Sequence, residues 1–443
     1  MSHIHDFVGI GLGPFNLGLA CLAAPIAELD GIFLDQQDGF DWHPGMLLED
    51  ATLQTPFLAD LVTLADPTSR YSFLNYLKTQ GRLYAFYIRE DFFLLRREYN
   101  QYCQWAAAQL PSLRFGHAVQ AVEYDAQRQC YQVQGQHAHS DRVFRHAARR
   151  LVLGTGTTPS VPACCGGLRA PVSHSSSYLQ DKPRLQRARS ITVLGSGQSA
   201  AEVYRDLLQD IDVHGYALQW ITRSPRFYPL EYTKLTLEMT SPEYIDYFHA
   251  LPEDTRAGLL AQQSGLYKGI NSSLINEIFD LLYRKRLAGP VDTALTTNTE
   301  LRGCHRQADG RLLLELHQHE QQQAYSMQTD ALVLATGYAA QVPAFLQPIA
   351  ERLRRDARGR LLADRNYCVD RESESVFVQN AELHTHGLAS PDLGMGCYRN
   401  ACILRRMLGR EVYPVERRIA FQRFGAPADG RPQPARQPLA VVS

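Results

Sequence analysis

Two short apolar runs, each followed by a glycine-rich turn, dominate the pattern of hydrophobic and polar positions. Each run predicts a buried strand, and apolar positions at helical spacing follow the turn before a second apolar run begins. The predicted strand, helix and strand are 6–10, 15–29 and 31–35 in the first unit, and 191–194, 199–208 and 218–222 in the second. This order is that of a β-α-β unit in a parallel sheet, so we expect an α/β fold built on two Rossmann-like units.

Later segments complete the predicted organisation. Apolar runs end in glycine loops at 151–156 and 331–338, which is typical of strands that close such units. A stretch at 242–287, rich in Leu, Tyr and charge, predicts a helical region, and 390–408 predicts a closing helix. Residues 425–443 are rich in Pro, Ala, Gln and Arg, which predicts a flexible tail.

The composition narrows the class of protein. With 45% hydrophobic residues, 21% charged residues and a formal net charge of -1, nothing favours a nucleic-acid or anionic-membrane partner. No apolar run approaches ~18 residues, and the first residues lack the pattern of a signal peptide. We therefore expect no membrane span and a cytoplasmic location. The 443 residues suit two or three domains.

The nine cysteines are scattered, and no C-x-x-C or C-x4-C pair is among them. An odd, unpatterned set of this kind favours reduced thiols in a cytoplasmic protein. The adjacent Cys164 and Cys165 suit a loop better than a redox centre. The sequence therefore argues against an oxidoreductase that reduces disulfides, because such enzymes need a closely spaced pair.

The first glycine turn has the residues of a dinucleotide site. Gly9 allows a tight turn, Gly11 lets the backbone approach a pyrophosphate, and the following helix presents free N–H groups. Gly13 and Pro14 complete the turn, with Pro14 where the full motif has a third glycine. Asp35, which ends the second strand, is placed to bond a ribose hydroxyl. A glycine turn without a ligand is the alternative.

The second glycine turn matches the G-x-G-x-x-A form more closely. Its predicted contacts are Gly195, Ser196, Gly197, Gln198 and Ser199. No acidic residue ends the next strand, and Arg223 and Arg226 stand there instead. An arginine can hold a 2′-phosphate that a carboxylate would repel, so we predict NADP rather than NAD. Each arginine has the alternative role of a solvated loop residue.

Two nucleotide sites in one chain imply that NADPH delivers hydride to a flavin, so we predict FAD at the first turn. The reduced flavin could then pass electrons to a partner or a disulfide, or it could react with O2. The absence of a closely spaced cysteine pair favours O2.

The chain resembles the N-hydroxylating flavoprotein monooxygenases of siderophore biosynthesis, which act on lysine, ornithine or a diamine. The likeness covers nearly all of the chain except the tail. It is carried by residues 9–16, 41–46, 53–58, 66–69, 71–77, 335–338 and 385–387. The WHPGM block at 42–46 looks especially like the lysine branch, and 174–178 is similar to part of the wider flavin-monooxygenase signature.

The resemblance implies three regions. An FAD-binding domain is expected from 1–185 and 331–424, and an NADPH-binding domain from 186–235 and 290–330. A helical substrate-binding region is expected from 236–289, and 425–443 is the flexible tail.

The resemblance also implies the chemistry. NADPH reduces FAD, O2 forms a C4a-hydroperoxide on the flavin, and a neutral primary amine attacks its distal oxygen. No nucleophilic side chain, general base or metal ion is expected, because the cofactor performs the difficult step. The amine must still lose a proton, and burial beside the flavin would lower its pKa from about 10.4.

Several residues receive roles by motif match. Gln54 should lie by the flavin and nicotinamide as a positioning residue, and Trp42 and His43 should contact the FAD. A plain core position for Trp42 and a loop position for His43 are the alternatives. The helix that begins near Ser390 should aim its N-terminus, at Leu393, towards the flavin, where its dipole favours an anionic ring.

A departure from the family pattern bears on the substrate. The amino-acid hydroxylases of the family have a lysine in F-L-K-D-L that pairs with the substrate carboxylate, whereas this chain has Ala59. Leu266 and Tyr267 stand where the ornithine branch has an Asn before a Tyr. Losing an ion-pair partner would cost an amino acid roughly 3–5 kcal/mol. We therefore expect a diamine, cadaverine or putrescine.

A diamine carries a second ammonium, and Asp392 is its expected acceptor. The alternative for Asp392 is an ordinary helix start, with Ser390 as N-cap and Pro391 at the first helical position.

Other functions stay open. Lysine or ornithine hydroxylation, with Lys268 holding the carboxylate, is the first alternative. A Baeyer–Villiger or sulfur-oxidising flavin monooxygenase is the second, and a flavoprotein that donates electrons to a partner is the third. The resemblance also implies a homo-oligomer, a dimer or a tetramer.

Overall fold

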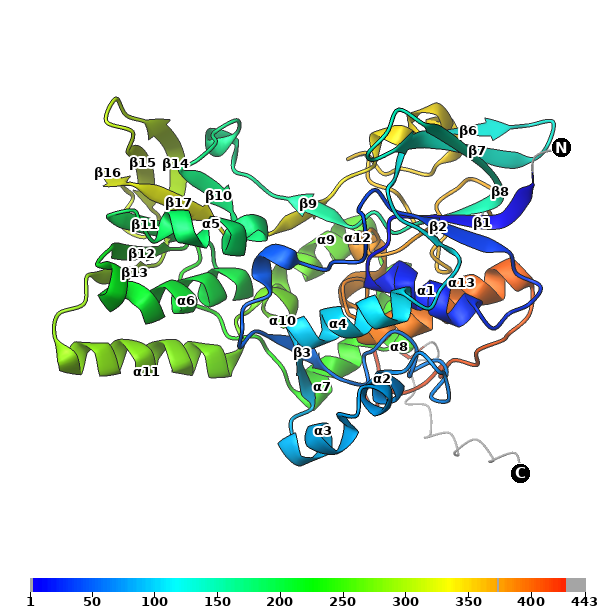
Figure 1. Ribbon diagram of the computed structural model, residues 1–443, viewed down its shortest axis with the longest axis horizontal. Helices are drawn as coiled ribbons and strands as arrows, with labels where there is room; N and C mark the ends of the chain where they lie inside the picture. Colours follow the sequence, from blue (N-terminus) through cyan, green and yellow to red (C-terminus); the bar gives the residue numbers. More distant parts are fainter. Residues whose placement is uncertain (1–2, 373, 428–443) are drawn as a thin grey trace.

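The computed structural model describes residues 3–372 and 374–427 (Figure 1). Two sheet units stand at opposite ends of the molecule, with helices below and between them. The predicted tail falls outside the described residues from 428 onwards. No helix in the described ranges has the length and hydropathy that crossing a membrane requires.

The first unit is a mixed sheet with the order β5-β2-β1-β8-β7-β6, and β19 also pairs with β8. Its strands are β1 (Ile4–Ile10), β2 (Gly31–Leu34), β5 (Leu113–Arg114), β6 (His117–Asp125), β7 (Cys130–His137), β8 (Val143–Leu153) and β19 (Val376–Val378). Strands β1, β2, β5, β8 and β19 run parallel, whereas β6 and β7 form an antiparallel extension. Since β19 comes from the C-terminal part, both ends of the chain build this sheet.

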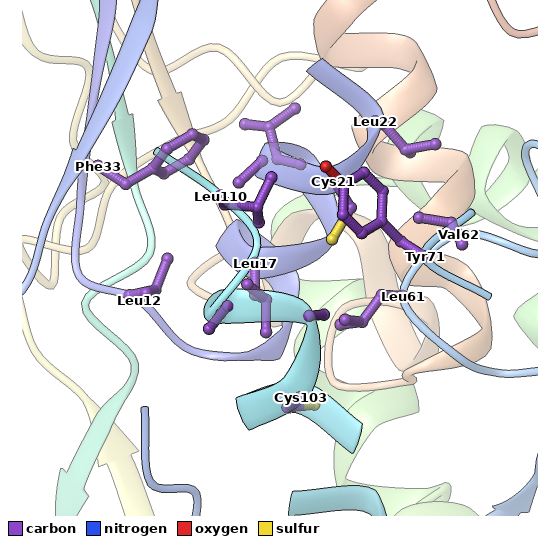
Figure 2. Close-up of a cluster of buried hydrophobic side chains, with 14 of the residues drawn as sticks. Leu12, Leu17, Cys21, Leu22, Phe33, Leu61, Val62, Tyr71, Cys103 and Leu110 are labelled. Atoms are coloured by element: carbon purple, nitrogen blue, oxygen red, sulfur yellow. The ribbon is translucent and has the colours of Figure 1, made fainter. Parts of the chain in front are cut away.

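Helices cover one face of the first sheet. They are α1 (Pro14–Ala23), α4 (Arg96–Ala107) and α13 (Gly394–Leu408), with α2 (Phe73–Thr79) and α3 (Leu83–Arg89) beyond them. Alternation along the strands sends Phe7 and Phe33 into this core, and Val8 to the opposite face. Figure 2 shows Leu17 and Cys21 of α1 within the core, near Leu61 of the loop that precedes α2.

The second unit is a parallel sheet with the order β10-β17-β11-β12-β13. Its strands are β10 (Val172–His174), β11 (Ser190–Leu194), β12 (Ala217–Ile221), β13 (Thr293–Thr296) and β17 (Ala331–Leu334). Helices α5 (Tyr178–Leu185) and α6 (Gln198–His214) pack on it, and an antiparallel sheet of β14 (Thr299–Arg306), β15 (Leu312–Gln318) and β16 (Gln323–Thr329) lies beside it. Both predicted β-α-β openings are therefore confirmed.

Two further strand pairs and several short helices complete the structure. The pairs are β3 (Thr52–Pro56) with β4 (Phe93–Leu95), and β9 (Thr157–Pro159) with β18 (Tyr338–Ala340). The short helices are η1 (Pro44–Met46), η2 (Ala163–Cys165), η3 (Ser175–Ser177), η4 (Glu238–Thr240), η5 (Ala344–Arg352), α12 (Leu383–His386) and η6 (Gly387–Ala389).

Helix ends differ from the prediction for local reasons. Helix α1 ends at Ala23 rather than near 29, because Pro25 cannot donate a backbone N–H to a continuing helix. The stretch 242–287 divides into α8 (Pro242–Ala250), α9 (Glu253–Gln262), α10 (Gly265–Lys268) and α11 (Ser272–Ala288), after a short α7 (Lys234–Leu237). Helix α11 packs against α6, in the core of the second unit. The division into cofactor and substrate regions stays a prediction.

Candidate cofactor and substrate site

The first glycine turn is too close to its neighbours for side chains. A Cβ on Gly11 would lie 2.6 Å from the carbonyl oxygen of Gly154, and one on Gly9 would collide with the Phe33 ring. Gly11 has a φ of +84°, which glycine adopts without strain. The space beside Gly13, the N-cap of α1, is open. With Pro14 at the first helical position, the turn presents bare backbone, as a bound pyrophosphate requires.

Asn16 holds this turn from behind, a role that the sequence did not reveal. Its side chain is fully buried, and its Nδ2 donates to the carbonyl oxygen of Gly11 at 2.6 Å. Its Oδ1 accepts from Gln379 Nε2 at 2.7 Å. One amide thereby joins the glycine turn to the segment after β19.

Asp35 closes the turn at the end of β2. One carboxylate oxygen accepts from the Leu12 N–H at 2.6 Å, and the other accepts from the Gln37 N–H at 2.8 Å. The carboxylate therefore positions the turn, and its contact with a ribose stays a prediction.

Three separate motifs converge at one corner of the structure. His43 has a φ of +54°, and its ring centroid is 5.9 Å from that of Tyr338, which is 5.2 Å from that of His174. A Cβ on Gly45 would collide with the carbonyl oxygen of Ser176, so the WHPGM block and η3 are in close backbone contact. The resemblance motifs at 42–46, 174–178 and 335–338 thus form one corner of the structure.

Trp42 and His43 have different surroundings. The Trp42 ring packs on that of Tyr99 with 5.3 Å between their centroids, and the Trp42 backbone N–H donates to Asn100 Oδ1 at 2.8 Å. His43 is exposed, yet many protein atoms surround its imidazole. The resulting loss of hydration lowers the pKa of His43 to about 4, with a further contribution from Arg96. His43 is therefore neutral at physiological pH.

Gln54, on β3, offers an unused donor. Its Nε2 is buried and has no hydrogen-bond partner in the described residues, and the same is true of Thr55 Oγ1. A buried amide without a partner costs free energy, so such groups point to a missing partner. This geometry fits the predicted position of Gln54 beside a flavin.

The second glycine turn repeats the design of the first. A Cβ on Gly195 would collide with the carbonyl oxygen of Ala335, and Trp220 Nε1 donates to the Gly195 carbonyl at 2.8 Å. Gly197 is the N-cap of α6, so Gln198 and Ser199 form the first helical turn, and Ser196 stands in the preceding loop. The free N–H groups of this long helix suit a second pyrophosphate.

The two arginines after β12 differ in their contacts with other residues. Arg223 is exposed and makes no hydrogen bond or ion pair with another described residue. The Arg226 guanidinium lies 4.5 Å from the centroid of the Tyr228 ring. Arg223 is thus the freer of the two to meet a 2′-phosphate, and the role of each stays a prediction.

A buried ion pair joins the two units, and sequence reasoning missed it. Arg96 of α4 binds Glu202 of α6 through two bonds of 2.8 and 3.0 Å, with side chains only 13% and 5% exposed. Arg96 also donates to the carbonyl oxygen of Met46 at 2.7 Å. Gln198 Nε2 donates to Glu202 at 2.9 Å, and its Oε1 accepts from the Asn271 N–H at 2.9 Å. The chain of bonds runs from the WHPGM block to the second glycine turn.

The predicted substrate residues Ala59 and Asp392 lie at the same place, at the start of α13. A Cβ on Gly394 would lie 2.9 Å from Asp392 Oδ1 and 3.8 Å from the Ala59 Cβ. Leu393, the N-cap of α13, lines a small cavity with Pro14 and Asn400. Both ends of the chain therefore meet where the sequence predicts the flavin and the amine.

Asp392 caps the closing helix. Its Oδ1 accepts from the Gly394 N–H at 2.6 Å and from the Met395 N–H at 3.3 Å, whereas its Oδ2 has no hydrogen bond in the described residues. The expected helix start at Ser390 is wrong: α13 begins at Gly394, and the Ser390 hydroxyl has no partner in this part of the chain. Ser390 and Pro391 precede the helix because Asp392, rather than Ser390, satisfies its first N–H groups.

The carboxylate of Asp392 lies in a poorly hydrated position. Burial raises the pKa of Asp392 above that of an ordinary aspartate, although its two backbone hydrogen bonds and Arg399 act in the opposite sense. Its charge also raises the pKa of Tyr232, after the larger effect of burial, so the two groups are neighbours. The Tyr232 ring is 6.1 Å from that of Phe93, on β4.

Leu266 and Tyr267 lie on α10, where the Glu231 N–H donates to the carbonyl oxygen of Gly265 at 3.1 Å. The carbonyl oxygen of Lys268 would be 3.3 Å from a Cβ on Gly197, so α10 adjoins the second glycine turn. Lys268 Nζ lies over the Tyr267 ring, 5.2 Å from its centroid. Helix α10 therefore adjoins both the second glycine turn and the segment that leads to Tyr232, and the role of Lys268 stays a prediction.

One group of side chains in the described ranges could hold a metal ion. Asp30 Oδ2 accepts from His3 at 2.6 Å and from His5 at 2.8 Å, at the start of β1. These residues take no part in the site described above.

Comparison with known proteins gives consistent results across the chain. Residues 3–340 match the model of the family described as L-lysine 6-monooxygenase/L-ornithine 5-monooxygenase. A putrescine N-hydroxylase of Shewanella oneidensis is 54% identical over 434 residues, which are 97% of this chain and 86% of that protein. An alcaligin biosynthesis enzyme of Bordetella pertussis is 52% identical over 437 residues, 98% of this chain and 95% of that protein.

Solved structures agree with these relatives. The FAD-bound crystal structure of a cadaverine monooxygenase of desferrioxamine biosynthesis, from Erwinia amylovora, is 61% identical with a TM-score of 0.94. The match covers 96% of this chain and 100% of that one. An ornithine N-hydroxylase of Kutzneria sp. 744, with reduced FAD, NADP+ and L-ornithine, is 28% identical with a TM-score of 0.85 over 92% and 99%. The predicted α/β fold class is thereby confirmed.

Proposed function

The chain belongs to the L-lysine 6-monooxygenase/L-ornithine 5-monooxygenase family, and we propose that it N-hydroxylates a diamine, cadaverine or putrescine. The reaction uses FAD, NADPH and O2, and its N-hydroxydiamine product serves the synthesis of a hydroxamate siderophore. The relatives named as a putrescine N-hydroxylase and a cadaverine monooxygenase support this choice.

One observation carries the choice of a diamine over an amino acid. Beside the start of α13, the side chain at position 59 is a methyl group and the carboxylate of Asp392 is nearby, whereas the Arg399 guanidinium is already paired with Glu382. A substrate carboxylate would meet repulsion there, whereas a distal ammonium would find an acceptor in Asp392 Oδ2. Lys268, the cation of the amino-acid alternative, lies over the Tyr267 ring on α10, beside the second glycine turn.

The cofactors are assigned to the two glycine turns. The bare backbone at Gly9 to Pro14 and the unpartnered Gln54 Nε2 fit FAD, and the N-terminus of α6 with Arg223 fits NADPH. The unit that contains β1 is therefore the FAD domain, and the unit that contains β11 is the NADPH domain. When bound, the flavin accepts hydride from NADPH and activates O2.

The protein's own contribution is position and dryness. Asp392 holds the distal ammonium, which fixes how far the other amine reaches towards Gln54 and the flavin. Burial of the reacting amine disfavours its ammonium form, so it favours the neutral, nucleophilic form. The ion pair of Arg96 and Glu202 keeps the two units in register for hydride transfer.

The test is a comparison of substrates. Purified protein, FAD and NADPH are mixed separately with cadaverine, putrescine, lysine and ornithine, and hydroxylamine product and H2O2 are measured. We expect product from a diamine and little from either amino acid. Product mainly from an amino acid would overturn the diamine assignment, and NADPH oxidation that yields only H2O2 with every amine would overturn N-hydroxylation.

Location and assembly are further parts of the proposal. All nine cysteines are free, which suits the reducing cytoplasm. Helix α3 has no buried residue, and Tyr84, Tyr87 and Ile88 are 73–79% exposed, which favours a second copy of the chain as its cover. A mass measurement in solution that gives a monomer would refute the homo-oligomer.

A further inference from the structure

The last described segment of the chain crosses back over the substrate side. We call residues 420–425 the C-terminal strap. Glu238 of η4 accepts from the Phe421 and Gln422 N–H groups, both at 2.9 Å, and from Gln422 Nε2 at 3.0 Å. Glu243 of α8 accepts from the Ala420 N–H at 3.1 Å. The strap has no helix or strand of its own, so these two carboxylates hold its backbone.

Aromatic contacts fix the strap further along. Phe424 is half-buried, and its ring centroid lies 4.9 Å from that of Tyr244 and 6.3 Å from that of Tyr247. Gly425 approaches Tyr247 so closely that a Cβ there would lie 3.2 Å from the ring. The strap therefore packs on α8 through its side chains as well as its backbone.

Helix α8 in turn packs on the loop that carries Asp392. Ile245 is fully buried and forms a cluster with Ala389 and Met395. These two residues precede and follow Asp392 in the sequence, each three positions away from it. Phe248 would lie 3.2 Å from a Cβ on Gly387, whose φ is +67°. Contacts thus run from the strap, through α8, to both ends of the segment 387–395.

The strap also holds α7. Gln422 Nε2 donates to the carbonyl oxygen of Leu235 at 2.6 Å. Helix α7 follows Tyr232, whose pKa is raised by burial and, to a smaller extent, by the charge of Asp392. The α7 segment and α8, which both lead to the surroundings of Asp392, are therefore both held by the strap.

We propose that the C-terminal strap is a positioning element of the diamine site, with Glu238 and Phe424 as the residues that transmit its hold to Asp392. The proposal rests on the proposed function of this site. In it, release of the strap lets α7 and α8 move, and the loop that carries Asp392 loses its fixed position. The distal ammonium is then held less well, whereas cofactor binding at the two glycine turns is unaffected.

The experiment compares Glu238→Gln and Phe424→Ala with the wild-type holoenzyme. For each protein, KM and kcat are measured with cadaverine and with pentylamine, which lacks the distal ammonium. We expect KM for cadaverine to rise about tenfold, since weakening charge-assisted hydrogen bonds costs about 1.5 kcal/mol. The pentylamine constants, KM for NADPH and the flavin spectrum should stay close to wild type.

Two further variants separate positioning from folding. Phe424→Tyr keeps the ring and should restore the wild-type KM, and Asp254→Asn removes an exposed carboxylate on the neighbouring α9 and should change nothing. Equal losses with cadaverine and pentylamine, or loss of bound FAD, would show a merely structural strap and overturn the proposal. An unchanged cadaverine KM in both test variants would also overturn it.

The wild-type assay distinguishes failure of the two proposals. If the wild type hydroxylates a diamine but the strap variants behave like it, only the positioning role falls. If the wild type hydroxylates no diamine, the proposed function fails and the strap proposal falls with it.

Discussion

Replacing Asp392 with asparagine tests the charge that selects the substrate while it preserves the local structure. The Oδ1 atom of asparagine can still accept from the Gly394 and Met395 N–H groups, as the aspartate does at 2.6 and 3.3 Å. The side chain keeps its size, and α13 keeps its cap. The change therefore removes the negative charge that we propose faces the distal ammonium, and little else.

The magnitude follows from the position of the carboxylate. A carboxylate and an ammonium about 4 Å apart attract by about 4 kcal/mol at the effective dielectric of a partly buried site. Removing one partner of such a hydrogen-bonded pair costs about 2–5 kcal/mol in measured cases. We expect a loss near 3 kcal/mol for Asp392→Asn, which lowers kcat/KM for cadaverine roughly 100-fold.

The assay measures hydroxylamine formation from cadaverine and from pentylamine in parallel. Pentylamine lacks the second ammonium, so its kcat/KM should change little, and the preference for the diamine should collapse. An Asp392→Asn variant with an unchanged ratio of the two values would refute the reasoning. Loss of both activities, together with loss of bound FAD, would instead assign Asp392 to the helix start alone.

The raised pKa of Asp392 adds a dependence on pH. Burial is its main cause, so the carboxylate takes up a proton at a higher pH than an ordinary aspartate does. The KM for cadaverine should rise as the pH falls through that pKa, and the variant should lack this response. The effect of ionised Asp392 on stability is unfavourable. Because the Asp392 carboxyl binds its proton more tightly in the folded chain than in the unfolded chain, ionised Asp392 lowers the free energy of unfolding at neutral pH. Asp392→Asn should therefore raise Tm at pH 7.

Three other substitutions test the cofactor sites. Arg223→Ala should raise KM for NADPH roughly 30-fold and leave KM for NADH unchanged, because a charge-assisted contact to the 2′-phosphate is worth about 2 kcal/mol; equal changes for both cofactors would refute its role. Glu202→Gln leaves the buried guanidinium of Arg96 uncompensated, so unfolding by denaturant should show a loss of about 3 kcal/mol, and stopped-flow flavin reduction should slow. Asn16→Ala removes bonds of 2.6 and 2.7 Å from a fully buried amide; we expect Tm to fall and the Kd of FAD to rise, and an unchanged Kd would show that Gly11 keeps its place unaided.

Structural features that depend only on residues close together in the sequence were predictable. Glycine turns, short apolar strands and the helix after each turn depend on local sterics and local periodicity, so both β-α-β openings lie close to their predicted positions. Helix ends were less predictable. Pro25 ends α1 early, and the start of α13 depends on which of two neighbouring oxygens, that of Ser390 or that of Asp392, meets the first N–H groups.

Contacts between distant segments were not predictable. Arg96 and Glu202 are 106 positions apart, and Glu238 and Phe421 are 183 apart, so no periodicity or spacing links either pair. Each residue taken singly is an ordinary charged or aromatic residue on a helix or a loop. The bonds appear only once the sheets bring the segments together, and a single sequence contains no signal for them.

Ala59 shows how the two kinds of argument complete each other. Because the family pattern has a lysine there, the sequence identifies which charge is missing, but a missing cation alone predicts only weaker binding of an amino acid. The structure supplies the other half, since it places the carboxylate of Asp392 beside the same turn of α13, with one oxygen unused. A site with no cation at position 59 and an available carboxylate oxygen at Asp392 should favour an ammonium instead of merely binding a carboxylate less well. Ala59→Lys should therefore pair with Asp392 and reduce diamine activity without creating a lysine hydroxylase, and only the double variant with Asp392→Asn would free the new ammonium for a carboxylate.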